Sequence, residues 1–223
     1  MERLREVLAF VNQKGGVGKT TTVQNLATGL CLFGKGHFGN DAQGKQRAPR
    51  VLVIDLDPQS CASFLFGWSE TQQSGKPNLY DALVQQGQLP VYKVRDNIYL
   101  APSSSKLIGI EPFLNQMAVP RKALCKLLAK PLAEMQGTDL ADEGVTDVAE
   151  AFDYVLIDCP PAMSLLTYNA LTAATSVVLP VQLEMLATKG LAEIINAVKE
   201  TREDLNPNLD IRGLLMVMSN DQT

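Results

Sequence analysis

The sequence is poor in the residues that build metal centres, disulfide frameworks and membrane spans. It has one histidine, His37, and four cysteines without a C-x-x-C spacing, Cys31, Cys61, Cys125 and Cys159. This scarcity argues against a zinc site, and scattered thiols are typical of a reducing compartment. No run of about 18 apolar residues occurs, and no long apolar stretch follows the charged N-terminus. We therefore expect a cytoplasmic protein without membrane insertion.

Aromatic residues and excess positive charge are scarce as well. Aromatic residues make up 6% of the 223 residues, and 20 Lys and Arg stand against 24 Asp and Glu, a net charge of −4. Composition therefore gives no support to nucleic-acid binding by the whole surface and leaves room for a local basic patch only. The hydrophobic fraction of 46% suffices for one sizeable core in a chain of this length. We expect a single domain over residues 1–223.

A glycine-rich loop stands out against this background. Residues 12–21 read NQKGGVGKTT, follow an apolar run and open a helical pattern, which is the context of a phosphate-binding loop. Glycines let backbone amides approach phosphate oxygens, the helix N-terminus adds partial positive charge, Lys19 neutralises phosphate charge and Thr20 can ligate Mg²⁺. We therefore predict a nucleotide site. The predicted contacts are Gly15, Gly16, Val17, Gly18, Lys19, Thr20 and Thr21.

Three aspartates follow apolar runs that are typical of buried strands. Residues 51–54 lead to Asp55 and Asp57, and residues 154–157 lead to Asp158. Ligands bind at strand ends in open α/β sheets, and a strand ending in aspartate is typical of a Walker B segment whose carboxylate holds Mg²⁺-bound water. Asp57 is the favoured residue for orienting an attacking water, although the spacing is compatible with a structural or Mg²⁺-shell role for either Asp55 or Asp57.

Apolar periodicity elsewhere alternates between strands and helices. Helical spacing begins near Lys19, with Gly34 placed to cap its end, and Asn78 caps a short helix. A helical stripe over residues 111–135 is interrupted by two prolines. The alternation predicts an α/β protein with a P-loop NTPase-like three-layer sandwich, in which helices flank a mostly parallel central sheet of about six or more strands. Further strands are expected at residues 7–11, 97–101, 176–181 and 211–218, and a further helix around residues 191–198.

Two long connections have little apolar content. Residues 34–50 contain four glycines, and we expect an exposed, mobile insertion loop without a function of its own. Residues 137–153 are acidic and are expected to form a solvated connection. After the final strand, Asn220 either reads the edge of an adenine or forms a turn.

The glycine-rich loop departs from the usual Walker pattern, and the departure carries a family resemblance. Gln13 stands where the usual pattern has its first glycine, and a second lysine, Lys14, lies inside the loop. The loop thereby resembles the deviant Walker A motif, KGGxGK[ST], of the ParA/Soj/MinD family of positioning ATPases. MinD proteins usually end in a membrane-seeking amphipathic helix, which is not visible here, so the resemblance is closest to ParA/Soj partition proteins. The matching stretches cover nearly the whole chain and include residues 55–59, 77–83, 158–161, 165–171 and 179–182.

The resemblance implies an activity and a set of partners. ParA/Soj proteins hydrolyse ATP to ADP and phosphate, with Mg²⁺, as an ATP-sandwich homodimer in which the residue matched by Lys14 reaches the partner's nucleotide. By the same match, Asp57 is the hydrolytic aspartate, and Asp55 and Asp158 order the water shell of Mg²⁺. The resemblance further implies nonspecific DNA binding by the ATP-bound dimer, nucleoid association, a ParB-like adaptor that stimulates turnover, and segregation of DNA or positioning of another cargo.

Several positions depart from the family pattern. Ser60 stands where glycine is common, Leu183 where proline is common, and Asn220 where aspartate often stands. Relatives continue beyond the strand at residues 211–218 with a further strand and helix that carry basic, DNA-binding residues. By this comparison the chain looks truncated or unusually short, and the DNA contacts are expected in a C-terminal segment outside it.

Two other functions fit the same loop. One is a dimeric regulatory or scaffold protein that binds ATP with little hydrolysis and serves a membrane or secretion machine. The other is a small-molecule kinase or ligase, for which no acceptor site is recognisable in the sequence. The sequence has no matched pair of cysteines placed to bridge two subunits, so it gives little support to metal-cluster reductase chemistry.

Overall fold

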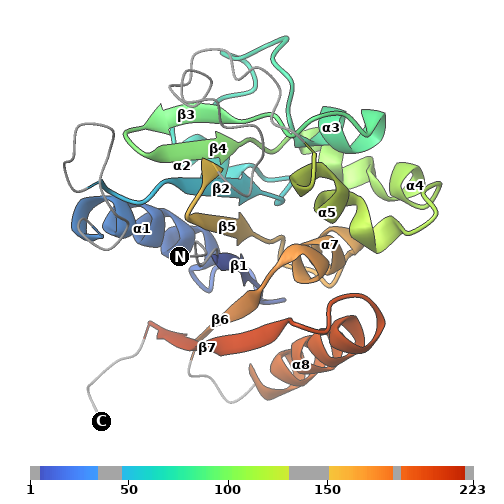
Figure 1. The fold of residues 1–223 in the computed structure, drawn as a ribbon. Coiled ribbons are helices and arrows are strands. Elements are labelled where there is room, and N and C mark those ends of the chain that lie inside the picture. Colours follow the sequence, from blue (N-terminus) through green and yellow to red (C-terminus); the bar gives the residue numbers. More distant parts are fainter. Residues whose placement is uncertain (1–5, 35–46, 131–150, 183–186, 219–223) are drawn as a thin grey trace.

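The computed structural model describes residues 6–34, 47–130, 151–182 and 187–218. Its centre is a seven-stranded sheet with the order β3-β4-β2-β5-β1-β6-β7 (Figure 1). All neighbouring strands run parallel except the antiparallel pair β3–β4. The mostly parallel sheet predicted from the sequence is confirmed. The strands span Glu6–Phe10 (β1), Val51–Asp55 (β2), Tyr92–Arg95 (β3), Ile98–Ala101 (β4), Tyr154–Asp158 (β5), Ser176–Gln182 (β6) and Asp210–Val217 (β7).

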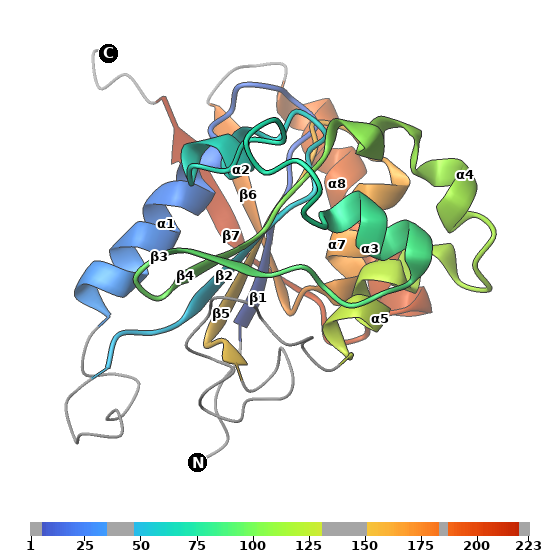
Figure 2. The ribbon, with the colours of Figure 1, turned by 90° about the horizontal axis from the view of Figure 1, so that it is seen from above.

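Helices cover both faces of the sheet, as Figure 2 shows. α1 and α2 pack on one face, while α3, α5, α7 and α8 contribute to the core on the other. This is the expected three-layer sandwich. The helices span Lys19–Phe33 (α1), Cys61–Leu65 (α2), Leu79–Gln85 (α3), Glu111–Leu114 (α4), Ala123–Leu128 (α5), Leu165–Ala173 (α7) and Ala187–Asp204 (α8), with 3₁₀ turns at Ser105–Gly109 (η1) and Pro120–Lys122 (η2).

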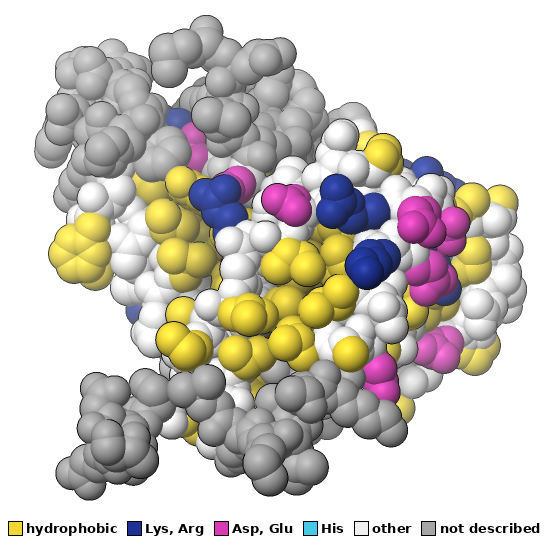
Figure 3. All heavy atoms as spheres, turned by 90° about the horizontal axis from the view of Figure 1, so that it is seen from below, with side chains coloured by type: hydrophobic (Ala, Val, Ile, Leu, Met, Phe, Trp, Pro, Cys, Tyr) yellow, Lys and Arg dark blue, Asp and Glu magenta, His cyan; other side chains and the backbone are white. Residues whose placement is uncertain are grey.

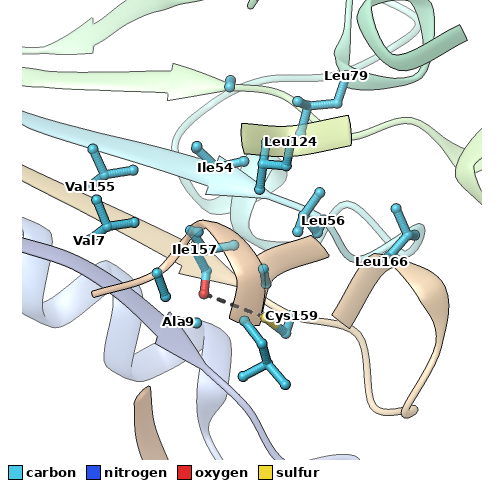
Figure 4. Close-up of a cluster of buried hydrophobic side chains, with 14 of the residues drawn as sticks. Val7, Ala9, Ile54, Leu56, Leu79, Leu124, Val155, Ile157, Cys159 and Leu166 are labelled. Carbon is cyan, nitrogen blue, oxygen red and sulfur yellow. Dashed lines mark hydrogen bonds between the residues drawn. The ribbon is translucent and has the colours of Figure 1, made fainter. Parts of the chain in front are cut away.

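Alternate side chains of each central strand enter different cores. In β1, Val7 and Ala9 join the cluster on the α7 side, and Leu8 and Phe10 join the cluster on the α1 side. Figure 4 shows the first cluster, where side chains of β1, β2 and β5 lie beside Leu124 of α5. Because both faces are covered, the central strands are nearly continuous apolar runs, which made them predictable.

Local sequence explains where two helices begin and end. The Asn78 side chain accepts hydrogen bonds from the Tyr80 and Asp81 amides, and Asp81 accepts one from the Asn78 amide, which forms a capping box for α3. At the end of α1 the Gly34 amide donates to the Leu30 carbonyl at 2.8 Å, and a β-carbon at position 34 would collide with that carbonyl. Both caps match the sequence prediction.

Some elements differ from the sequence prediction. The helical stripe expected over residues 111–135 is divided into α4, η2 and α5, because Pro120 opens a separate 3₁₀ turn; its end, beyond Lys130, lies outside the described residues. β3, α2 and α7 were not predicted. β3 is four residues long with alternating exposure, and α2 is five residues long, so neither has a strong periodic signal.

The ends of the two long connections meet at a buried ion pair. The Arg47 guanidinium donates to both carboxylate oxygens of Asp153 at 2.7 Å, and the Arg50 amide donates to the same carboxylate at 2.8 Å. Asp153 is 4% exposed, and Ala48 is buried. The expectation of an exposed loop over residues 34–50 and a solvated connection up to Asp153 therefore does not hold at these ends, since the ion pair anchors them; residues 35–46 and 131–150 lie outside the description.

The edge strand β7 exposes apolar side chains on the face of the molecule seen from below. Leu214 and Met216 are 56% and 63% exposed, and Figure 3 shows hydrophobic side chains gathered on this face. Across the part of the chain that the structure covers, no helix combines the length and apolar character needed to cross a membrane.

Candidate functional site

The glycine-rich loop connects the C-terminal end of β1 to α1. Gly16 and Gly18 have φ values of 74° and 75°, in the left-handed region that favours glycine. Gly18 directly precedes α1, and its position for a β-carbon lies 3.9 Å from the Val217 side chain of β7. The first turn of this 15-residue helix carries no acidic residue. No carboxylate of that turn therefore weakens the partial positive charge that the helix N-terminus places at the loop.

The Lys19 side chain lies inside the loop and binds backbone carbonyl groups of the loop. Its ammonium donates to the carbonyl oxygens of Asn12 at 3.0 Å and Lys14 at 3.3 Å, and the residue is 6% exposed. Burial lowers the pKa of Lys19, while the nearby negative charge of Asp158 partly offsets this change. The ammonium is thus held beneath the loop, on the inner side where phosphate charge would lie.

Lys14 lies on the outer side of the same loop. It is exposed, its amide donates to the Asn12 side chain at 2.9 Å, and its ammonium donates to the Gln182 side chain at 2.9 Å. Gln182 is the last residue of β6. The two lysines of the motif therefore point in different directions, Lys19 into its own loop and Lys14 toward the neighbouring strand.

Asp55 and Asp158 end two adjacent strands in register, and both are fully buried. Asp55 accepts hydrogen bonds from the Asp57 amide at 3.1 Å and from the Ser63 amide and hydroxyl, both at 2.7 Å. Both oxygens of Asp158 are buried and accept no hydrogen bond from any residue that the structure describes. The Thr20 hydroxyl lies close to the Asp158 carboxylate without reaching hydrogen-bond geometry.

Burial raises the proton affinity of both carboxyl groups, and a neighbouring carboxylate adds to the increase in each case. Burial raises the pKa of Asp55 to about 7, and the charge of Asp158 adds to the increase. Burial raises the pKa of Asp158 to about 6, an increase that the Thr20 hydroxyl partly offsets and the charge of Asp57 reinforces. Negative charge is therefore concentrated at the ends of β2 and β5, beside the loop, and the Lys19 ammonium balances it only in part.

Asp57 lies two residues beyond β2 in a tight turn and is partly exposed. Its carboxylate accepts a hydrogen bond from the Gln59 amide at 2.9 Å, and its carbonyl accepts one from the Ser60 amide at 2.8 Å. Ser60 has a φ of 55°, a left-handed conformation that favours glycine. This conformation explains why the family pattern described above often has glycine at the position of Ser60.

A cavity of about 920 Å³ opens beside the loop and brings the predicted residues together. Lys19, Thr20 and Asp57 line it, and an apolar wall from α2, η1 and the end of β7 completes it. Val17 is buried and does not line the cavity, so its side chain belongs to the packing of the loop. Asn220 lies outside the described residues. Other residues that line the cavity include Gly15, Gly16, Gly18, Thr21, Phe64, Leu65, Trp68, Ile108 and Met218.

The donor set fits Mg²⁺. This ion takes oxygen ligands and keeps several of its waters, so it needs few protein groups. The Thr20 hydroxyl and the hydrogen-bond-free oxygens of Asp158 are such groups, and they lie together at the loop. Asp55, whose two oxygens already accept bonds from the protein, has less capacity for water than Asp158.

Sequence reasoning missed two residues at this edge, Ser63 and Ser103. Both are fully buried, and their hydrogen bonds connect the ends of β2 and β4 to the start of α2. A signal was available for Ser103, because it follows a predicted strand at the sheet edge where ligand-binding residues gather. For Ser63, which lies in a five-residue helix, no pattern pointed to the site.

Comparison with known proteins shows which proteins the chain is similar to. A family model described as an AAA domain matches residues 5–211. The chromosome partitioning protein ParA of Caulobacter vibrioides (strain NA1000 / CB15N) is 36% identical over 217 residues, which cover 95% of this chain and 69% of that protein. The sporulation initiation inhibitor protein Soj of Bacillus subtilis (strain 168) is 35% identical over 221 residues, or 98% of this chain and 74% of that protein.

A solved structure shares the same fold. Cobyrinic acid a,c-diamide synthase from Mycobacterium smegmatis, crystallised with bound ADP and magnesium, superposes with a TM-score of 0.77 at 31% identity. The match covers 98% of this chain and 77% of the synthase chain. The fold is therefore one in which a relative binds an adenine nucleotide together with magnesium.

Proposed function

The chain belongs to the ParA/Soj family of P-loop ATPases, and from this premise we propose that it hydrolyses ATP to drive a cycle that segregates DNA or positions another cargo. One observation carries the proposal: a single cavity brings together Lys19, Thr20 and Asp57, with the hydrogen-bond-free carboxylate of Asp158 close to Thr20. Phosphate, divalent cation and attacking water each find a complementary group there.

The loop would bind ATP with Mg²⁺. Backbone amides of residues 15–21 at the start of α1 surround the phosphates, and Lys19 neutralises their charge from beneath the loop. Thr20 would ligate Mg²⁺, and Asp158 with Asp55 would order its water shell. Bound Mg²⁺ would supply positive charge at the β- and γ-phosphates.

Asp57 would orient the water that attacks the γ-phosphorus, with ADP leaving through the β–γ bridging oxygen. It is the one aspartate of the three that lines the cavity, while Asp55 and Asp158 are fully buried beneath it. Its turn is fixed by hydrogen bonds at both the carboxylate and the carbonyl. Positioning and electrostatic stabilisation supply the catalysis.

Lys14 would act in a homodimer. Lys14 is exposed on the outer side of the loop and is not among the residues that line its own cavity, which supports a role toward a second subunit's nucleotide. Nonspecific DNA binding by the ATP-bound dimer, association with the nucleoid in the cytoplasm and stimulation by a ParB-like adaptor complete the proposal. These partners come from the family, because the described surface does not identify a DNA-contacting residue.

The test is the solution mass of the chain with Mg²⁺ and ATP, measured beside Lys14→Ala, with hydrolysis followed in the same samples. The proposal expects ATP to convert the wild type to a dimer and Lys14→Ala to lose the dimer or the turnover. Equal turnover by two monomeric proteins would reject the action of Lys14 in a partner subunit. An ATP-driven dimer without turnover would instead favour an ATP-binding scaffold.

A synthase activity has weaker support. The named relative acts on an acid, and an acid substrate needs cationic side chains near the nucleotide. Among the described residues that line the cavity, Lys19 is the sole cation, and it is already committed to the loop. We therefore prefer a function in partition. ATP turnover that DNA stimulates in the absence of any organic acid would distinguish a partition ATPase from a synthase.

A further inference from the structure

Four residues at the edge of the sheet form a closed ring of hydrogen bonds. The Ser103 hydroxyl donates to the Asp57 carbonyl at 2.6 Å, and the Ser103 amide donates to the Ser63 hydroxyl at 3.0 Å. The Ser63 hydroxyl donates to Asp55 at 2.7 Å, and Asp55 accepts from the Asp57 amide at 3.1 Å. The ring therefore holds both the amide and the carbonyl of Asp57.

The ring connects the neighbouring elements β2 and α2 to the segment that follows β4, about 40 residues later in the chain. Asp55 ends β2, Ser63 belongs to α2, and Ser103 lies two residues beyond the end of β4. Asp55, Ser63 and Ser103 are each 0% exposed, so water does not compete for these bonds. Buried hydrogen bonds that run in one direction toward a carboxylate strengthen one another. Asp57 is the member of the ring that reaches the cavity.

From this geometry we propose that Ser103 is a positioning residue for Asp57. It fixes the backbone of Asp57 so that the carboxylate faces the water beside the γ-phosphate. The inference rests on the proposed ATPase function, because it gives Ser103 a task in that reaction. Ser103 does not line the cavity, so its effect passes through the Asp57 peptide.

Removal of the Ser103 hydroxyl would loosen this peptide without leaving it unsatisfied. The Asp57 carbonyl retains its hydrogen bond from the Ser60 amide, and the Ser103 amide retains its bond to Ser63. Ser103→Ala is therefore expected to fold and to bind nucleotide, because the loop and Lys19 are untouched. What it loses is the fixed orientation of Asp57.

The neighbouring Ser104 offers a matched control. It is also buried, at 1% exposed, but its side chain accepts a hydrogen bond from the Lys106 amide and takes no part in the ring. Ser104→Ala makes the same chemical change one residue away. Three variants of the full chain, Ser103→Ala, Ser104→Ala and Asp57→Ala, would be compared with the wild type.

Three quantities would be measured: steady-state ATP hydrolysis, affinity for a non-hydrolysable ATP analogue, and amide hydrogen exchange of residues 56–60 without nucleotide. We expect Ser103→Ala to lower kcat about 10-fold while KM and analogue affinity stay within about 2-fold, the signature of lost positioning. The Ser60 amide, which donates to the Asp57 carbonyl, should exchange faster in Ser103→Ala. Ser104→Ala should match the wild type in all three.

The inference is overturned if Ser103→Ala leaves kcat and exchange unchanged, or if analogue affinity falls together with kcat, which would indicate general disruption. It is also overturned if Ser104→Ala has the same effect. Failure of the proposed function has a different signature: the wild type does not hydrolyse ATP, or Asp57→Ala hydrolyses it normally. In that case the exchange of residues 56–60 alone decides whether Ser103 holds the Asp57 peptide.

Discussion

Asp55 and Asp158 are register partners at the ends of β2 and β5, yet their carboxylates differ in the hydrogen bonds that they accept. Both are 0% exposed. Asp55 accepts three hydrogen bonds from the amide of Asp57 and from Ser63, whereas Asp158 accepts none from the described residues. A buried carboxylate without a hydrogen-bond donor is destabilising, and the charge of Lys19 offsets this effect on Asp158 only in part. A cation bound at Thr20 would offset the unfavourable free energy of this buried charge.

Replacement of Asp158 should therefore stabilise the nucleotide-free protein and impair its function. Burial raises the pKa of Asp158 to about 6 in the folded chain, against about 4 for an unperturbed aspartate. The folded chain then binds more protons than the unfolded chain between these values, so stability falls as pH rises from about 4 through 6. We expect Asp158→Asn to be more stable than the wild type by about 1–2 kcal/mol at pH 8.

Urea unfolding at pH 4, 6 and 8, with and without Mg²⁺ and ATP, checks this prediction. Without ligand, the advantage of Asp158→Asn should grow between pH 4 and pH 6. With Mg²⁺ and ATP the order should reverse, because only the wild type gains the full stabilisation of the bound ligand. An advantage that does not change with pH would contradict a titrating Asp158 as the cause.

Asp57→Ala should separate nucleotide binding from hydrolysis. Asp57 lines the cavity, and the hydrogen bonds that hold Lys19 in the loop go to the Asn12 and Lys14 carbonyls instead, so ATP binding should persist. We expect turnover to fall on the order of 100-fold, as for loss of a group that orients the nucleophile. The variant should accumulate as an ATP-bound dimer in size-exclusion chromatography with light scattering. A monomeric variant, or one with normal turnover, would contradict the assignment of Asp57.

The sequence was sufficient for those parts of the fold whose residues carry a local signal. Central strands buried on both faces are continuous apolar runs, and the Asn78 and Gly34 caps follow from local chemistry. The loop and its aspartates were predictable because each follows such a strand. The short edge strand β3 and the helix α2 were missed, because four or five residues give too little periodicity to distinguish a strand or helix from a turn.

The organisation of the carboxylates could not be read from the sequence. Asp55 and Asp158 have the same residue type and the same strand-end position, and only the structure shows that Ser63 and the Asp57 amide bind one of them. These contacts depend on how α2 packs against the end of β2, which no local pattern encodes. Asp153 is a similar case, since it belongs to an acidic stretch but pairs with Arg47, 106 residues earlier.

The Arg47–Asp153 pair should be important for stability, in contrast to an ion pair on the surface. Asp153 is 4% exposed, so Arg47→Ala removes both guanidinium hydrogen bonds from a buried carboxylate, which keeps the bond from the Arg50 amide. We expect a loss of about 2–3 kcal/mol in the free energy of unfolding, without a change in nucleotide affinity. Arg212→Ala is the control, because the Arg212 side chain is 64% exposed where it pairs with Glu6. It should cost less than about 1 kcal/mol, and equal losses in denaturant titrations would contradict the contrast.

The turn after Asp57 stores backbone strain that a glycine should relieve. Ser60 has a φ of 55° at the start of α2, and its side chain makes no capping hydrogen bond there. Because a side chain disfavours the left-handed region and the amide would still donate to the Asp57 carbonyl, Ser60→Gly should gain about 0.5–1 kcal/mol. Gln86→Gly is the matched control, since Gln86 ends α3 with a φ of 50°, and it should gain a similar amount.

The hydrolysis rates of these two glycine variants show whether the backbone strain at Ser60 contributes to ATP hydrolysis. We expect both to hydrolyse ATP within about 2-fold of the wild type, because the ring through Ser103 holds the Asp57 peptide independently of the residue at position 60. If Ser60→Gly is more stable but slower, while Gln86→Gly is more stable and equally active, the strained serine contributes to the orientation of Asp57. The departure of this chain from glycine at position 60 would then be functional rather than tolerated.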